Sequence, residues 1–304
     1  MLTQTVAYFK HGLGNLIMMT PALQAMASMD PSGKIDICMD SKWKDARRQS
    51  YDTFFEEWDL VQKVINHPRQ NLRKYKTWFW TGHAEHSDAL KIFMDKSSLQ
   101  SNTPDWRGRH IHEAYWYMEI ANKYGYRGPT PKQYVPIAKK PLLGKKRKPL
   151  IGICDGTFAS KMLIIKKYPY FSELVETLQS YYNATIVKIG YQEELKNVPA
   201  NIDYVNKLSF TETAKVISQL DLLITTDTAN MHVGDALDIP MIALFGGTLI
   251  SKNGALSKKA VNLAKGLHCQ PCQKTEAFYN CEHYNCINQL TVGDVMDEVR
   301  RILK

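Results

Sequence analysis

The sequence predicts an α/β protein made of two doubly wound halves. Apolar strand-like runs alternate with helix-like segments from the N-terminus onward, and the alternation starts again near residue 150. Between the two series lies a basic stretch, residues 138–149, whose two prolines and one glycine are typical of a linker. The chain has 304 residues, more than one ordinary core holds. We therefore expect two domains, residues 1–140 and 149–304.

In the first half, an apolar run at residues 6–9 predicts the first strand. A glycine turn follows, and Leu16, Met19 and Leu23 then recur at the spacing of one helix face. Three strands and a helix are expected after it, in chain order, at residues 35–39, 61–65, 78–80 and 111–124.

In the second half, Ser209 and Glu212 have the spacing of a capping box, and Asp227 is placed to cap a later helix. Four short apolar runs predict strands at residues 150–154, 185–189, 222–226 and 241–245. Helices are expected near residues 171–182, 210–219 and 228–237. This order predicts a parallel sheet that collects a ligand at the carboxyl ends of its strands.

Composition limits the class of protein and its partners. Hydrophobic residues make up 44% of the chain, and no apolar run reaches the roughly 20 residues that span a bilayer. The N-terminus lacks the pattern of a signal peptide, so we expect a cytoplasmic protein, free or peripheral at the inner membrane, or in the host cytoplasm if it is viral. The net charge of +9 predicts an anionic partner, whether nucleic acid, lipid phosphate or nucleotide.

The most specific motif is a polar turn after the strand expected at residues 222–226. The turn opens a helix, where free backbone N–H groups attract an anion. In chain order its residues are Thr226, Asp227, Thr228, Ala229, Asn230, Met231 and His232. This string resembles the lipopolysaccharide heptosyltransferases of glycosyltransferase family 9, which usually read Thr-Asp-Thr-Gly-Pro-Met-His. Here Ala229-Asn230 stand in place of Gly-Pro, and we expect the turn to bind the donor.

The resemblance implies the GT-B fold, in which two Rossmann-like doubly wound domains face a central cleft. In that fold the N-terminal domain binds the acceptor and the C-terminal domain binds the nucleotide sugar. The family inverts the anomeric centre without a catalytic metal. This implies transfer of a sugar from a nucleotide-diphosphate sugar, such as ADP-heptose. The chain contains no Asp-x-Asp pair, the usual ligand set for a metal-bound diphosphate.

A second matching segment follows the first expected strand. Gly12, Gly14 and Asn15 open a helix that continues through Thr20-Pro21-Ala22-Leu23, and the family signature runs Gly-Leu-Gly-Asp to Thr-Pro-Ala-Leu. The resemblance places the general base at the Asp of this signature, but position 15 is Asn, and an amide cannot accept the proton. Asn15 stays a candidate for positioning the acceptor hydroxyl. The candidate bases are Asp155, His83, Glu85 and Asp88, each of which also fits a solvated or structural role.

Other residues are expected at the donor. By resemblance, Lys166 contacts the donor diphosphate, a role that suits a compact ammonium as negative charge develops on the leaving group. Glu193 or Glu194, just after a strand, can accept the hydroxyls of a ribose. Both glutamates fit an ordinary helix start equally well.

Aromatic and basic residues interleave in the first half, where Trp80, Arg107 and Arg109, with the glycines at 12 and 14, are acceptor candidates. A partly buried aromatic core with a solvated rim explains the same pattern. Near the C-terminus, four cysteines have a spacing close to structural zinc sites. They are Cys269, Cys272, Cys281 and Cys286. We expect a structural zinc or iron ion there, against the alternative of buried free thiols.

Three functions remain open at this point. The favoured one transfers a sugar to a lipopolysaccharide core or related glycan. The second glycosylates a hydroxylated base in viral DNA, which the positive charge and basic stretches such as residues 42–48 and 69–76 also suit. The third is a nucleotide-sugar-binding protein that lost catalysis with the base at position 15.

Overall fold

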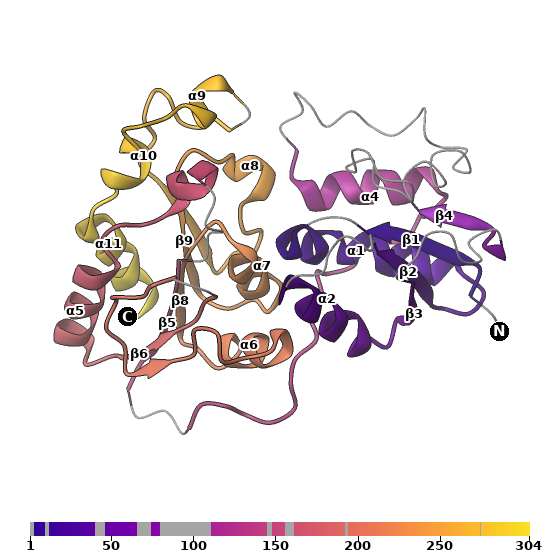
Figure 1. Cartoon of the computed structure of the whole chain (residues 1–304), viewed down its shortest axis with the longest axis horizontal. Helices are drawn as coiled ribbons and strands as arrows, with labels where there is room; N and C mark the ends of the chain where they lie inside the picture. The colour runs from indigo at the N-terminus through magenta and orange to yellow at the C-terminus, as the bar shows by residue number, and fades with distance from the viewer. Residues whose placement is uncertain are drawn as a thin grey trace. The chain divides into compact units, whose positions relative to one another are not determined.

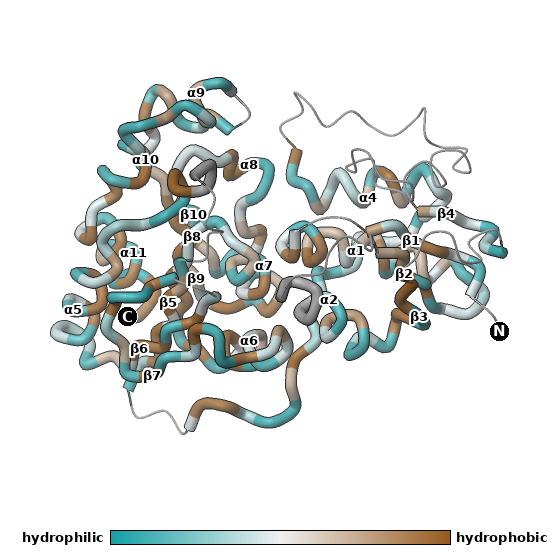
Figure 2. Tube along the Cα trace, in the orientation of Figure 1, coloured by the Kyte–Doolittle hydropathy of each residue, from teal (hydrophilic) through white to brown (hydrophobic). Residues whose placement is uncertain are grey.

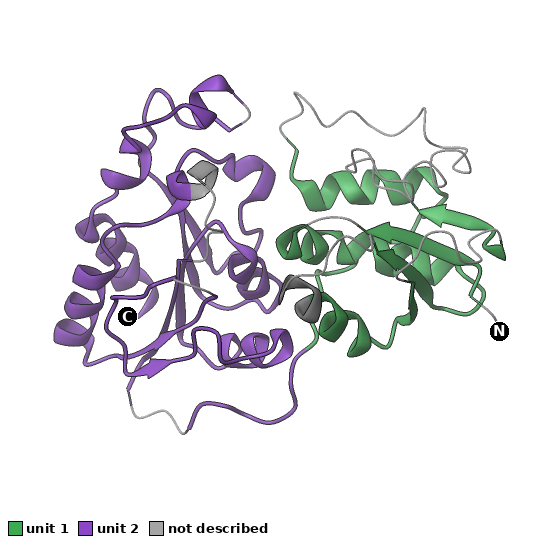
Figure 3. Ribbon diagram, in the orientation of Figure 1, with its two compact units in different colours: residues 1–136 green, residues 137–304 purple. Residues whose placement is uncertain are grey.

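The computed structural model describes residues 3–9, 12–39, 46–65, 74–79, 111–144, 148–155, 161–191, 194–273 and 275–304, with only the backbone described at 46–50 and 161–163. The chain divides into two compact units, Met1–Pro136 and Ile137–Lys304 (Figure 3). Each unit has its own parallel sheet with helices packed on it, which confirms the α/β class predicted from the sequence.

The sheet of unit 1 has four strands in the order β3-β2-β1-β4 (Figure 1). They are β1 (Thr5–Phe9), β2 (Ile35–Met39), β3 (Val61–Ile65) and β4 (Thr77–Phe79). All three strand pairs are parallel, and every residue of β1 and β2 is buried. Continuous apolar strands of this kind are expected where both faces of a parallel sheet are covered. Strands β2 and β3 lie on one side of β1, and β4 lies on its other side. Because the strand order reverses at β1, ligands are expected at the carboxyl end of this strand.

In the described part of unit 1, three helices accompany this sheet. They are α1 (Leu13–Met29), α2 (Ala46–Glu56) and α4 (Glu113–Lys123). Helix α1 is buried on nearly all sides and packs against α4. The start of α4 is fixed by His112, whose Nδ1 accepts a hydrogen bond from the Ala114 backbone N–H at 3.2 Å. Helix α4 therefore has a defined first turn close to the first turn of α1.

The sheet of unit 2 has six parallel strands in the order β10-β9-β8-β5-β6-β7. They are β5 (Leu150–Cys154), β6 (Thr185–Lys188), β7 (Ile202–Asp203), β8 (Leu222–Thr226), β9 (Met241–Phe245) and β10 (Ala260–Ala264). The order reverses between β5 and β8, which makes the carboxyl ends of these two strands the switch point of the sheet.

Where unit 2 is described, it has eight helical segments. They are the 3-10 helix η3 (Lys161–Lys166), α5 (Phe171–Tyr182), α6 (Phe210–Ile217), α7 (Ala229–Ala236), α8 (Ile250–Asn253), α9 (Glu276–Tyr279), α10 (Asn285–Asn288) and α11 (Val292–Ile302). The predicted capping box on α6 is confirmed, because Ser209 and Glu212 exchange both of its hydrogen bonds.

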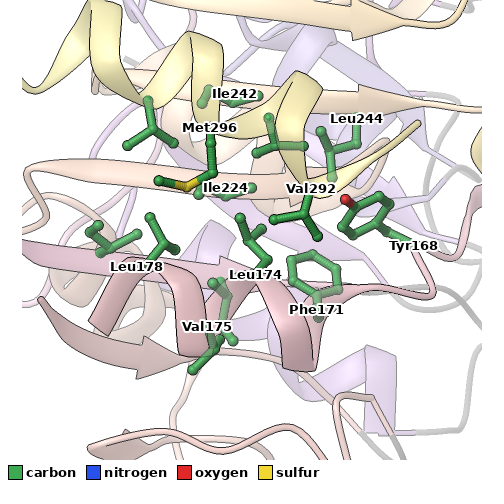
Figure 4. Packing of buried hydrophobic residues seen from close by; sticks show 14 of the residues in the cluster. Tyr168, Phe171, Leu174, Val175, Leu178, Ile224, Ile242, Leu244, Val292 and Met296 are labelled. Atoms are coloured by element: carbon green, nitrogen blue, oxygen red, sulfur yellow. The ribbon is translucent and has the colours of Figure 1, made fainter. Parts of the chain in front are cut away.

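One face of this sheet is covered by α5 and α11, and apolar side chains from both helices meet the strands there (Figure 4). Leu174 and Leu178 of α5 and Met296 of α11 lie against Ile224 and Ile242 of the sheet. Fully burying such a side chain contributes about 1.5 to 3 kcal/mol. The hydropathy trace shows the same pattern, with apolar strands between more polar helices (Figure 2). This core holds the ends of β5 and β8 in fixed register.

The segment expected as a linker packs against unit 2 where it is described. Leu143 is buried, and the backbone N–H groups of Leu142 and Leu143 donate to Gln219 Oε1 at 2.9 and 3.3 Å. Tyr204 Oη in turn donates to the Leu142 carbonyl at 3.1 Å. Of the linker predicted at residues 138–149, residues 139–141 and 144 are exposed as expected, whereas Leu142 and Leu143 anchor it to unit 2. Lys145, Lys146 and Arg147 lie outside the described residues.

Candidate functional site

Two carboxylates lie at the switch point of unit 2. Cys154 ends β5 beside Thr225 of β8, so the next residue of each chain segment emerges at the same edge of the sheet. Asp155 follows β5, and Asp227 follows β8 after Thr226. Helix α7 is tied to this edge because Asn230 Nδ2 donates to Cys154 Sγ at 2.9 Å.

Asp227 forms a buried ion pair with Lys166. The Lys166 Nζ lies 2.8 Å from Asp227 Oδ2 and donates to the Asp227 backbone carbonyl at 3.3 Å. Only 7% of the Asp227 side chain and 18% of the Lys166 side chain are exposed. Burial alone raises the pKa of Asp227, but the Lys166 ammonium, with His232 and Thr248, holds that pKa below its ordinary value. The Asp227 carboxylate therefore stays ionised at neutral pH.

The role expected for Asp227 at the start of α7 was wrong. The helix is capped by Thr228 in an extended conformation, with no hydrogen bond from its side chain. Asp227 instead directs its carboxylate to Lys166, which comes from the end of η3. A cap satisfies backbone N–H groups, whereas the observed arrangement fixes an ammonium at the sheet edge.

Five other donor candidates lie beside Asp227 in the chain, at the end of β8 and at the start of α7. Thr226, Met231 and His232 are buried, and Thr228 and Ala229 are half-buried at the first turn of α7. Thr248, with 1% exposure, approaches Asp227 from the end of β9. Thr248 was not a predicted site residue, although its place just after the expected strand at residues 241–245 was a signal that could have found it.

Asp155 and Glu194 form a second acidic group near Lys167. Asp155 accepts a hydrogen bond from the Tyr168 N–H at 3.1 Å, and Glu194 accepts one from the Tyr191 N–H at 2.7 Å. Burial raises the pKa of Asp155 to about 7, and the Glu194 charge adds to the shift while Lys167 opposes it. Burial likewise raises the pKa of Glu194 to about 7. Both carboxylates therefore titrate near neutral pH, as a proton-transferring group requires.

In unit 1, the glycine turn after β1 leads into the first turn of α1. Gly12 is exposed, and Gly14 and Asn15 are half-buried. Asn15 Nδ2 donates a hydrogen bond to Glu113 Oε2 at 2.8 Å. Glu113, the first residue of α4, is buried. Glu113 could not be predicted from the sequence, because an acid in the first turn of a helix is an ordinary feature and 98 positions separate it from Asn15.

Several predicted residues lie outside the described part of the chain. They are Trp80, His83, Glu85, Asp88, Arg107, Arg109 and Glu193.

The four C-terminal cysteines are free thiols close to one apolar cluster. Cys286 is buried with Ile165 and Phe278, and Cys272 and Cys281 pack against this cluster. Burial raises the pKa of Cys286 to about 11, and the neighbouring thiols add to the shift. Among the residues that the structure describes, no group of three or more His, Cys, Asp or Glu side chains is placed to hold a metal ion. The structural zinc or iron ion expected at Cys269, Cys272, Cys281 and Cys286 therefore has no support in the described arrangement of these thiols.

These features define a two-unit α/β protein with polar residues at the switch point of each sheet, the architecture of GT-B glycosyltransferases. The family model described as glycosyltransferase family 9 (heptosyltransferase) matches residues 81–283. The chain belongs to this family.

Two curated relatives match shorter segments. Lipopolysaccharide heptosyltransferase 1 of Pseudomonas aeruginosa is 33% identical over 79 residues, 26% of this chain and 22% of the relative. Lipooligosaccharide heptosyltransferase 2 of Haemophilus influenzae is 28% identical over 134 residues, 39% of this chain and 37% of the relative. The matched segments thus span well under half the length of each relative.

Solved structures match the fold over the whole chain. Heptosyltransferase II of E. coli has a TM-score of 0.73 at 14% identity, covering 99% of this chain and 98% of that one. A family 9 glycosyl transferase from Veillonella parvula has a TM-score of 0.75 at 17% identity, covering 99% and 97%. The iron-containing dodecameric glycosyltransferase TibC from enterotoxigenic E. coli has a TM-score of 0.67 at 13% identity, covering 98% and 75%. These likenesses confirm the GT-B fold.

No helix in the described ranges is both long and apolar enough to cross a membrane.

Proposed function

We propose that this protein is an inverting, metal-independent glycosyltransferase. It moves a sugar from a nucleotide-diphosphate sugar such as ADP-heptose to a hydroxyl of an anionic acceptor. The observation that carries this proposal is the buried Lys166–Asp227 pair at the switch point of unit 2. Family membership supports the same reaction class, and a solved relative in complex with ADP-D-β-D-heptose, TibC, supports the donor.

Lys166 supplies the positive charge that the donor needs. Negative charge develops on the nucleoside diphosphate as its bond to the anomeric carbon breaks, and a fixed ammonium stabilises that charge more than the ground state. Asp227 holds the ammonium in place through two contacts of 2.8 and 3.3 Å. The N–H groups at the start of α7, next to Thr228, add the positive end of the helix. A cation and a helix end thus do the work that a metal ion does in other transferases.

The acceptor we favour is a lipopolysaccharide core or a related glycan. Its phosphates complement the net charge of +9, and both curated relatives act, by name, on lipopolysaccharide or lipooligosaccharide. The alternatives are viral DNA with a hydroxymethyl-cytosine-type base and binding of a nucleotide sugar without transfer. With a glycan acceptor, the protein works in the cytoplasm or at the inner face of the membrane.

The test offers ADP-heptose and other nucleotide sugars to heptose-deficient lipopolysaccharide and to hydroxymethylated duplex DNA, side by side. The expected product is a lipid core heavier by one heptose, measured by mass spectrometry. A mass gain on the nucleosides would instead establish the DNA enzyme. Nucleotide binding with no transfer to either acceptor would support the binding protein.

K259A is the matched control for the loss of one lysine. Lys259 is paired with Asp238 at 2.9 Å as Lys166 is with Asp227, but the Lys259 side chain is 55% exposed. K259A should transfer at the wild-type rate, whereas K166A should not.

A further inference from the structure

The hydrogen bond between Asn15 and Glu113 joins two first turns of helices. Asn15 lies in the first turn of α1, just after the carboxyl end of β1, and Glu113 is the first residue of α4. The Nδ2–Oε2 distance of 2.8 Å is that of a good hydrogen bond to a carboxylate. In the parallel sheet of unit 1, the end of β1 is the switch point where a ligand is expected.

The orientation of the Asn15 amide follows from this bond. Its nitrogen faces Glu113, and its Oδ1 lies 3.4 Å from the place where a Cβ on Gly12 would sit. Gly12 is exposed, Asn15 is half-buried, and only 4% of the Glu113 surface is exposed to solvent. The Asn15 amide therefore links the exposed glycine turn to the buried Glu113 carboxylate.

Tyr117, one turn further along α4, also faces this pair. Burial raises the pKa of Tyr117 well above its ordinary value, the Glu113 charge adds to the shift, and an interaction with Asn15 opposes it. The phenol therefore keeps its proton at neutral pH and cannot serve as a base. Asn15, an amide, cannot accept a proton either. Glu113 is the member of this group that can.

Asp155, one of the two carboxylates at the switch point of unit 2, accepts a hydrogen bond from the Tyr168 N–H. It lies on the same sheet edge as Lys166 and Asp227, the residues proposed to bind the diphosphate. By resemblance to GT-B enzymes, the N-terminal unit binds the acceptor, so we expect the base in that unit. Glu113 lies in that unit.

We propose that Glu113 is the general base of the transfer and that Asn15 positions its carboxylate. This inference rests on the function proposed above. The proton of the acceptor hydroxyl passes to the Glu113 carboxylate, and the acceptor oxygen forms a bond to the anomeric carbon. The bond between that carbon and the diphosphate oxygen breaks, and its electron pair leaves with the nucleoside diphosphate beside Lys166.

The experiment exchanges the two side chains. Full-length wild-type, E113Q, N15D/E113Q and E119Q proteins are compared for kcat and for the KM of ADP-heptose, with the acceptor identified by the transfer assay. Glu119 lies on the same helix and is half-buried, so E119Q controls for the loss of one carboxylate from α4. In N15D/E113Q, the new amide at position 113 donates to the new carboxylate at position 15, which restores a carboxylate within one hydrogen bond of its original place.

E113Q should lower kcat by about 100-fold or more, the usual contribution of a general base, with the KM for the donor unchanged. N15D/E113Q should recover kcat to within about tenfold of wild type, and E119Q should match wild type. If Glu113 had only a structural role, kcat would follow the melting temperature in these variants, and a folded E113Q protein would keep most of its kcat.

Two results would overturn the inference while the proposed function stands. One is an E113Q protein that keeps more than a tenth of wild-type kcat, and the other is a folded N15D/E113Q protein that stays inactive. If E113Q does not fold, E113D takes its place. It keeps the charge, shortens the reach by one methylene, and should lower kcat at an unchanged donor KM. A wild-type protein that transfers no sugar would refute the proposed function and this inference with it.

Discussion

Replacing Asp227 with Asn removes one member of the buried ion pair and leaves the other. Lys166 then keeps the Asp227 backbone carbonyl at 3.3 Å but loses the carboxylate oxygen at 2.8 Å. Breaking a fully buried pair costs about 3 to 5 kcal/mol, because an uncompensated charge remains. Lys166 keeps 18% of its side chain exposed, so water recovers part of this cost. We expect D227N to lower the free energy of unfolding by about 2 to 4 kcal/mol.

The pH dependence gives the prediction a second readout. Because the folded-state pKa of Asp227 lies below its ordinary value of 3.8, the stabilisation is complete above that value and is lost as the pH falls through the lower folded-state pKa. Wild type and D227N should therefore differ in stability at neutral pH and converge in acid. Urea unfolding monitored by circular dichroism measures both. In a unit of this size the loss corresponds to a fall in Tm of about 5 to 15 °C.

The control is D238N. Asp238 pairs with Lys259 at 2.9 Å, but 61% of its side chain is exposed. Its backbone has a φ of +54°, a conformation that Asn tolerates. Exposed pairs contribute about 0 to 1 kcal/mol, so D238N should unfold nearly as wild type does. If D227N is no less stable than D238N, the buried pair does not have the electrostatic role assigned to it here.

Three further predictions concern other parts of the site. K166A should weaken ADP binding by about tenfold or more in calorimetry, because it removes the cation at the diphosphate, and unchanged affinity would refute the donor assignment. D155N should remove a pH dependence of stability that the Asp155 carboxyl causes. The folded-state pKa of Asp155 is raised to about 7 from its ordinary value of 3.8. The carboxyl therefore stabilises the fold fully below pH 3.8, and this stabilisation is lost as the pH rises to about 7. Urea unfolding of wild type and D155N at about pH 5 and about pH 8 measures this difference, and parallel curves would contradict it. Elemental analysis tests the predicted zinc or iron ion: metal that wild type carries and the C272S/C286S variant loses would establish the site, whereas metal-free wild-type protein grown with both metals would show that the thiols only pack.

The sequence predicts the strands of unit 2 well, because their apolar runs are short and bounded by turn residues. The strands at residues 150–154, 222–226 and 241–245 lie where they were expected. Strand β10 escaped prediction because it lies at the sheet edge and its residues are only half-buried, which gives no apolar run. Helix α11 was missed as well, although Val292, Val295 and Met296 have the spacing of a helix face.

The site residues likewise differ in whether the sequence could predict them. The polar turn at Asp227 is local in sequence, so its place at a strand end could be predicted. The contacts that give it its chemistry could not, since the carboxylate turns away from the helix to reach a lysine 61 positions earlier. Glu113 shows the same limit, because only the packing of α4 on α1 brings it to Asn15. A site whose chemistry depends on a side chain from another helix has no local sequence pattern that could predict it.

The hydrogen bond between Asn15 and Glu113 also bears on how such a site changes during evolution. An acid and an amide that share one hydrogen bond can exchange places without any shift of the backbone, because each side chain accepts or donates in its new position. A route that first places an aspartate at position 15, with the glutamate of α4 still present, keeps an acid at the turn in every intermediate. A route that first places a glutamine on α4 passes through a form with none. A lineage can therefore move its acid from one helix to the other by two substitutions in the right order.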